Sequence, residues 1–180
     1  MRPLFEDMCA CEDLFSSQNS QFARRTFVRS VFAFHEAHFY TFKNTAIEWL
    51  IKDSWQNRKI EVSKLALLKD VEYRPDKTGV LKESASRLPF LNQIALVLRT
   101  LAESAGVDPT TIFSDNGWSS MQTALSVRHR ITHPKVPTEL EINDEEMDAA
   151  RDSVRWAFAS TQRVVQGKLV KHGIMPKGDS

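Results

Sequence analysis

Basic and titratable side chains are concentrated in one short segment, RHRITH, which spans residues 128–133. Its two arginines are permanently charged, whereas His129 and His133 can gain or lose a proton near neutral pH. An arginine beside a histidine suits phosphodiester cleavage, because the histidine can move protons while the guanidinium stabilises the extra negative charge of the transition state. RNA carries its own nucleophile, the 2′-hydroxyl, so such a site needs neither a metal nor a serine.

The segment lies at the end of a predicted helix, at about residues 118–133, because Pro134 disfavours helical geometry in the residue before it. On a helical wheel Arg128 falls near the middle of the apolar face, the two histidines lie at its edge and Arg130 points to solvent. The apolar face is formed by Trp118, Met121, Ala124, Leu125 and Ile131. An arginine in an apolar seam is costly unless an anion meets it, and this anion could be an internal carboxylate, a carboxylate of a second subunit or a ligand phosphate.

The segment resembles the signature of HEPN domains, in which an arginine is followed by a polar residue and then, after four to six intervening positions, by a histidine. Arg128, His129 and His133 match these three places, with four residues between the arginine and the histidine. HEPN domains are helical bundles with the motif near the end of a late helix, followed by a loop and a further helix. In the order of its predicted helices the chain resembles these domains over about residues 20–170, although only the motif is specific.

Many HEPN proteins are metal-independent endoribonucleases, and their active site forms where two protomers bring their motifs together. The resemblance therefore implies that Arg128, His129 and His133 are catalytic, that no metal or cofactor is needed, and that RNA is cleaved to give 2′,3′-cyclic phosphate ends. It also implies a homodimer with a composite active site and, because such nucleases often belong to toxin–antitoxin or phage-defence systems, an antitoxin or another regulatory partner. The alternative is a non-catalytic HEPN-like module for dimerisation or for interaction with RNA or protein.

Two other interpretations of the histidines remain open. His129 and His133 form an H-x-x-x-H pair, which can hold zinc from one helical face, but Arg130 occupies the place of the glutamate in the protease motif and opposes a cation. His35 and His38, in the segment HEAH, lie on the apolar face of a long predicted helix. They are either core histidines with hydrogen-bond partners or residues that surround Arg128 and His133 and help to position them.

Two further segments have features of nucleic-acid-binding elements. Residues 101–114 resemble the start of a helix-turn-helix, but the proposed recognition segment, residues 108–117, has no arginine or lysine and two acids, so it would repel a phosphate backbone. The segment RRTFVR, residues 24–29, places three arginines near the start of the long helix. These arginines indicate either a solvated face or a patch that guides RNA.

The elements that must position the motif are predicted to be helical throughout, and the fold class is all-α. We expect an up-and-down HEPN-like bundle of four to five helices, with a lead segment at residues 1–19, the bundle domain at 20–170 and a flexible tail at 171–180. Gly106 is a predicted C-cap and Asn143 a predicted N-cap. Residues 73–79 are predicted to form a loop, and residues 134–143 an extended connector. Helices are expected at about residues 20–52, 62–71, 89–105, 118–133 and 143–170.

Composition limits the possible partners. The chain has 180 residues and a net charge of +1, so one domain is expected, and any binding of a nucleic acid must depend on a local patch. Its two cysteines, Cys9 and Cys11, complete neither a metal site nor a disulfide framework, which favours the cytoplasm. The acidic start does not resemble a signal peptide, and no apolar run is long enough to predict a membrane span. The long phenylalanine-rich helix offers more apolar surface than one thin bundle would bury, which favours a two-fold homodimer.

Overall fold

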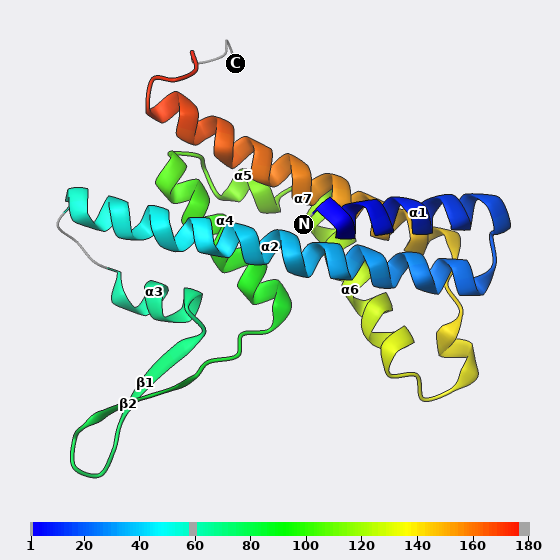
Figure 1. Cartoon of the computed structure of the whole chain (residues 1–180), viewed down its shortest axis with the longest axis horizontal. Helices are drawn as coiled ribbons and strands as arrows, with labels where there is room; N and C mark the ends of the chain where they lie inside the picture. Colours follow the sequence, from blue (N-terminus) through cyan, green and yellow to red (C-terminus); the bar gives the residue numbers. More distant parts are fainter. Residues whose placement is uncertain (1, 58–60, 177–180) are drawn as a thin grey trace. The chain divides into compact units, whose positions relative to one another are not determined.

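The computed structural model describes residues 2–57 and 61–176 of the chain (Figure 1). These residues form seven α-helices, one short 3-10 helix and one two-stranded antiparallel sheet, which confirms the predicted all-α class. They belong to two compact units: one contains the residues up to Tyr40 together with Thr110–Ser160, and the other contains Thr41–Pro109 together with the residues from Thr161 onward. The long helices α2 (Gln21–Asn57) and α7 (Asp144–Lys171) contribute residues to both units.

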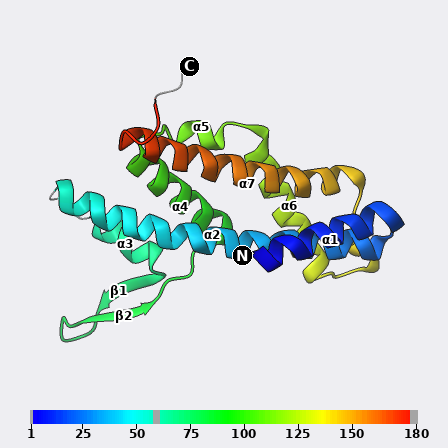
Figure 2. The same ribbon diagram turned by 45° about the horizontal axis from the view of Figure 1, so that its top comes forward.

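The first unit contains α1 (Arg2–Gln18), residues 21–40 of α2, α5 (Thr110–Phe113), α6 (Asn116–Thr132), the 3-10 helix η1 (Pro137–Leu140) and residues 144–160 of α7. Helix α1 lies in the lead segment, for which no element was predicted. Figures 1 and 2 both show it alongside the start of α2, where the ring centre of Phe5 lies 5.9 Å from that of Phe34 and 5.8 Å from that of Phe158. Helix α1 therefore adds to the core of the first unit.

The core of the first unit is built on the phenylalanine-rich face of α2. Phe27, Val31 and Phe34 recur on this face at helical spacing, and all three are buried. The buried residues of α6 are Met121, Ala124, Leu125, Val127 and Ile131. Four of these five residues belong to the predicted apolar face, so the helical wheel identified most of the buried side of this helix correctly.

Two histidines lie inside this core, as predicted for core histidines: His35 and His38 are 0% and 2% exposed. His35 Nε2 lies 2.9 Å from the hydroxyl oxygen of Ser153, and that hydroxyl donates to the carbonyl of Ala150. The serine oxygen must therefore accept from Nε2–H, so His35 is neutral with its proton on Nε2. Burial and then the neighbouring His38 lower the pKa of His35 from 6.5 to about 3. Burial lowers the pKa of His38 to about 4, although a hydrogen bond to the backbone of Ala157 acts in the opposite direction.

A glycine in α6 makes room for a buried tryptophan. A Cβ atom added at Gly117 would lie 2.5 Å from Cβ of Trp156 and 2.6 Å from its Cδ1. The tryptophan cannot move away freely, because its Nε1 donates to the carbonyl of Ile112 at 3.0 Å. Alanine favours a helix over glycine by about 1 kcal/mol, but overpacking of a core costs about 1–3 kcal/mol.

We therefore expect Gly117→Ala to lower the free energy of unfolding by up to about 2 kcal/mol, measured by urea denaturation. Ser119→Ala, at an exposed position of the same helix, is the control and should change this free energy by less than about 0.5 kcal/mol. A stabilised Gly117→Ala variant would contradict the close contact with Trp156.

The second unit contains residues 41–57 of α2, α3 (Val62–Leu68), β1 (Val71–Pro75), β2 (Leu81–Ala85), α4 (Phe90–Ala105) and the residues of α7 from Thr161 onward. The predicted loop at residues 73–79 is wrong in its first part, because Tyr73 lies in β1 and pairs with Glu83 of β2. The turn itself is shorter, and Asp76 accepts hydrogen bonds from the backbone N–H groups of Thr78 and Val80. The Pro, Asp and Gly signals therefore marked the tip of a hairpin, which extends away from α3 and α4 in Figure 2.

A buried charged cluster joins three helices of the second unit. Lys168 Nζ donates to the hydroxyl of Ser104 at 2.7 Å and to the carboxylate of Asp53 at 3.3 Å, and it lies 4.7 Å from the ring centre of Trp49. The Ser104 hydroxyl donates to the other oxygen of Asp53. Lys171 Nζ donates to the Ser104 carbonyl at 2.8 Å. Two lysines of α7 thus satisfy polar groups at the C-terminal end of α4.

Candidate active site

Helix α6 carries the predicted catalytic residues in and directly after its last turn. It begins after Asp115, whose carboxylate accepts hydrogen bonds from two backbone N–H groups of the first turn. It ends at Thr132, and the backbone N–H of His133 donates to the carbonyl of His129 at 3.1 Å. The end of the helix before the proline agrees with the sequence prediction. Arg128 and the two histidines are therefore brought together at one helix end.

Arg128 is less buried than the wheel predicted. Its side chain is 33% exposed, and its Nη2 lies 3.5 Å from a carboxylate oxygen of Glu36 on α2, whose side chain is 57% exposed. The anion that meets Arg128 in this chain is thus an internal carboxylate. A charge-assisted hydrogen bond is usually about 2.7–2.9 Å long, so Glu36 holds the guanidinium only loosely.

The side chains of His129 and His133 are exposed. They lie at the C-terminal end of α6, where the helix carries a partial negative charge. A further cation reaches the same place, because Nη2 of Arg29 on α2 donates to the carbonyl of Ile131 at 3.3 Å. Within residues 2–57 and 61–176 no carboxylate pairs with Arg29. The sequence did not place Arg29 in the site, although the segment RRTFVR was the signal that could have indicated it.

Arg130 does not point to solvent, so this part of the wheel prediction is wrong. It donates to the carbonyls of Glu139 and Glu141 at 2.8 Å and 2.7 Å, and to the carboxylate of Glu146 at 2.6 Å. The predicted N-cap Asn143 is confirmed, since its side chain accepts from the N–H of Glu146 while the Glu146 carboxylate accepts from the N–H of Asn143. A helical wheel ignores the chain beyond the helix, and here the connector that contains η1 folds back over Arg130.

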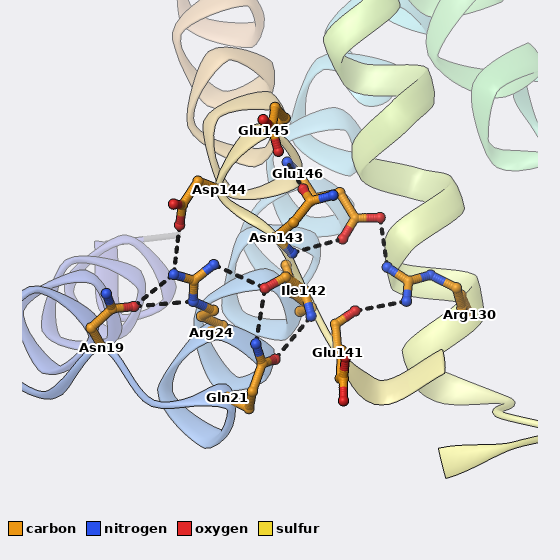
Figure 3. Close-up of a pocket in the computed structure, with 10 residues that line it drawn as sticks. All are labelled: Asn19, Gln21, Arg24, Arg130, Glu141, Ile142, Asn143, Asp144, Glu145 and Glu146. Carbon is orange, nitrogen blue, oxygen red and sulfur yellow. Dashed lines mark hydrogen bonds and ion pairs between the residues drawn. The ribbon is translucent and has the colours of Figure 1, made fainter. Parts of the chain in front are cut away.

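The connector between α6 and α7 borders an open pocket of about 660 Å³. Figure 3 shows Arg24 and Arg130 reaching this connector from α2 and α6. Arg24 donates to the carbonyl of Ile142 at 2.9 Å, to the side chain of Asn19 at 2.8 Å and to the carboxylate of Asp144 at 2.5 Å. Both arginines of the pocket are therefore paired with acids of the chain itself. The arrangement holds the connector in place and leaves little charge for an external anion.

The pairing of Arg130 makes a prediction about stability. Arg130→Ala should lower the free energy of unfolding by about 2–3 kcal/mol, because it leaves a part-buried carboxylate and two carbonyls without their donor. Arg155→Ala is the matched control, since Arg155 is exposed and, among the residues that the structure describes, pairs only with the nearby Asp152 on the same helix. Urea denaturation measures both variants. Equal stability of the two would contradict the structural role of Arg130.

Within the described parts of the chain no group of three or more His, Cys, Asp or Glu side chains converges in a way that could hold a metal ion, so the H-x-x-x-H pair has no further ligand in this region. No helix formed by the described residues has the length and apolar character needed to cross a membrane.

Comparisons with known proteins do not assign the chain to a family. No protein-family model matches it, and neither the curated proteins nor the solved structures contain a significant match.

Proposed function

We propose that the protein is a metal-independent endoribonuclease of the HEPN type, in which Arg128, His129 and His133 act on a phosphodiester bond of RNA. The observation that carries the proposal is the loose and partly exposed pairing of Arg128 with Glu36, at 3.5 Å. A guanidinium held in this way can exchange the carboxylate for a phosphate without breaking a buried network. The exposed histidines beside it supply imidazole groups that can serve as general acid and general base.

The proposed reaction uses the 2′-hydroxyl as nucleophile. His133 accepts the hydroxyl proton, the 2′-oxygen attacks the adjacent phosphorus, and the bond from phosphorus to the 5′-oxygen breaks. The leaving oxygen takes a proton from a protonated histidine, either His129 or a histidine in the motif of a second protomer. Arg128 stabilises the negative charge that the phosphoryl oxygens gain in the transition state. The products are a 2′,3′-cyclic phosphate and a 5′-hydroxyl.

The direct test is incubation of the purified protein with mixed RNA in EDTA. Cleavage should persist in the chelator, the products should carry 2′,3′-cyclic phosphate ends, and the His133→Ala variant should leave the RNA intact. Loss of cleavage in EDTA and its recovery with added zinc would instead favour the H-x-x-x-H pair. A nuclease of this kind requires control in the cell, so an antitoxin or another regulatory partner belongs to the proposal.

A composite site requires two copies of the chain. We expect a two-fold homodimer at micromolar concentration, measured by light scattering coupled to size-exclusion chromatography. Mixing an inactive Arg128→Ala chain with an inactive His133→Ala chain should restore part of the activity, because a mixed dimer contains one intact copy of each group. A monomer that cleaves RNA would exclude the composite site while leaving the chemistry possible.

A second candidate function is a non-catalytic helical module that binds RNA or protein. It is favoured by one observation, namely that Arg128 already has an internal carboxylate partner, Glu36. The Glu36→Gln variant separates the two functions. A nuclease should keep or increase its cleavage rate when the competing carboxylate is removed. If the ion pair is only structural, the RNA should remain uncleaved, and Glu36→Gln and Arg128→Ala should lower the free energy of unfolding by equal amounts.

A further inference from the structure

Two exposed aromatic rings and a cation lie on one line along α2. Phe22, Arg29, Glu36 and Tyr40 are separated by seven, seven and four residues, so they share one narrow side of the helix. Phe22 and Tyr40 are each 62% exposed. The 18 residues between them correspond to about 27 Å along the helix axis at 1.5 Å per residue. All four residues belong to the first unit.

Arg29 on this line and Arg25 beside it are held by backbone carbonyls and not by acids. Arg25 Nη1 donates to the carbonyl of Leu140 at 3.1 Å, and Arg29 Nη2 donates to the carbonyl of Ile131 at 3.3 Å. In the described ranges neither guanidinium pairs with a carboxylate. Carbonyls orient these side chains without neutralising them, so both keep a full positive charge at the surface. The acid on the line, Glu36, is paired with the arginine of the motif.

We propose that Phe22, Arg25, Arg29 and Tyr40 form a binding track that takes single-stranded RNA to the end of α6. Arg29 connects the two places, because it touches the carbonyl of Ile131 in the last turn of that helix. The inference rests on the proposed function for the cleavage step, but it concerns binding, for which it names the substrate as single-stranded.

Two exposed rings with two arginines between them are the basis for this choice of substrate. Bases stack on exposed aromatic side chains and phosphates meet arginines, and this combination binds single strands without sequence preference. The bases of a duplex are stacked on one another and cannot reach Phe22 or Tyr40. The rings are separated by about 27 Å along the helix, and single-strand sites cover about four nucleotides or more. Because the net charge of the chain is only +1, binding must come from such a local arrangement.

The test uses a fluorescently labelled 2′-O-methyl RNA, which cannot be cleaved, and fluorescence anisotropy with the full chain. Phe22→Ala should weaken binding about tenfold, because one stacking platform is lost, whereas Phe22→Trp should preserve it. Trp55→Ala removes an aromatic ring that is 81% exposed in the second unit, and it should leave the affinity unchanged. Arg29→Gln should reduce the slope of log K against log salt by about 0.7, the value for one phosphate contact with a single strand.

Several results would overturn the track: equal affinity for single strand and duplex, no binding of the oligonucleotide, or an effect of Phe22→Ala no larger than that of Trp55→Ala. A change of oligomeric state in Phe22→Ala without any change in RNA binding would assign the surface to a second copy instead. The outcome is separable from that of the nuclease proposal. If Phe22→Ala weakens binding but the wild-type protein cleaves no RNA, the binding track is supported and the nuclease proposal is wrong. If the wild-type protein cleaves RNA and Phe22→Ala binds it normally, the nuclease proposal is supported and the binding track is wrong.

Discussion

Replacing Arg128 with alanine is expected to lower kcat/KM for RNA cleavage by a factor of about 10²–10³, the usual effect of removing a preorganised charge donor from a transition state. His133→Ala should lose a comparable factor. The double variant should lose little more than either single variant, because groups that act as a unit are not additive. A fluorogenic RNA in EDTA measures these rates.

Neither change should unfold the protein. The pair between Arg128 and Glu36 is long and partly exposed, and pairs of this kind contribute about 0–1 kcal/mol to the free energy of unfolding. The side chain of His133 is exposed, and the hydrogen bond that ends α6 uses its backbone N–H, which alanine retains. Urea denaturation of both variants should therefore resemble that of wild type.

Arg130→Ala is the matched control, two residues from Arg128 on the same helix. It should lose stability, yet the folded fraction should cleave RNA at the wild-type rate per molecule. If Arg128→Ala and His133→Ala both melt far below wild type, these two residues are structural and the nuclease proposal is wrong. Cleavage of a substrate with 2′-deoxyribose at the scissile position would contradict the proposed nucleophile.

Acid should destabilise the first unit well before the carboxylates titrate. The pKa of His35 is about 3 and that of His38 about 4 in the folded protein, whereas both lie near 6.5 in the unfolded chain. Below pH 6.5 the unfolded chain therefore binds more protons than the folded one, and the free energy of unfolding falls as the pH is lowered. The stability that depends on the neutral rings is complete above pH 6.5, and it is lost progressively as the pH falls toward the two folded-state values.

At pH 5 each histidine should have cost about 2 kcal/mol of stability relative to pH 8, so the pair should cost about 4 kcal/mol. Urea denaturation at the two pH values measures this difference. His35→Gln and His38→Gln should each reduce it by about 2 kcal/mol, whatever their stability at pH 8. His172→Gln, at an exposed position near the end of the described chain, should leave it unchanged. An equal pH dependence in wild type and in the His35→Gln variant would show that His35 is not buried as a neutral ring.

The parts of the fold that followed from the sequence are those with strong local signals. The long run without glycine or proline predicted α2, and Gly106 marked the end of α4, where its φ of 74° suits a residue without a side chain. Asn143 predicted the start of α7 through its capping chemistry. The core positions of His35 and His38 followed from helical spacing. In each case the information lies within a few residues of the feature.

The features that were missed depend on residues distant in the sequence. The role of Arg130 comes from a connector that folds back over it, and the helical state of the lead segment is supported by contacts such as Phe5 with Phe34. The hairpin was not predicted, because the Pro, Asp and Gly residues of its turn indicated a loop and the flanking strands are short. For the same reason the sequence could place Arg128 and the histidines at one helix end but could not show that Glu36 pairs with Arg128 or that Arg29 reaches the carbonyl of Ile131 there.

The cluster of Asp53, Ser104 and Lys168 limits how this sequence can diverge. Loss of Asp53 alone would leave a buried ammonium without its carboxylate, and loss of Lys168 alone would leave the carboxylate without its cation, so either step passes through a destabilised form. Joint replacement by apolar residues avoids that penalty, because neither unpaired charge is ever buried. The two charged positions, one on α2 and one on α7, are therefore expected to change in a single evolutionary step. Among descendants of this chain we expect Asp53 and Lys168 to be kept together or exchanged together.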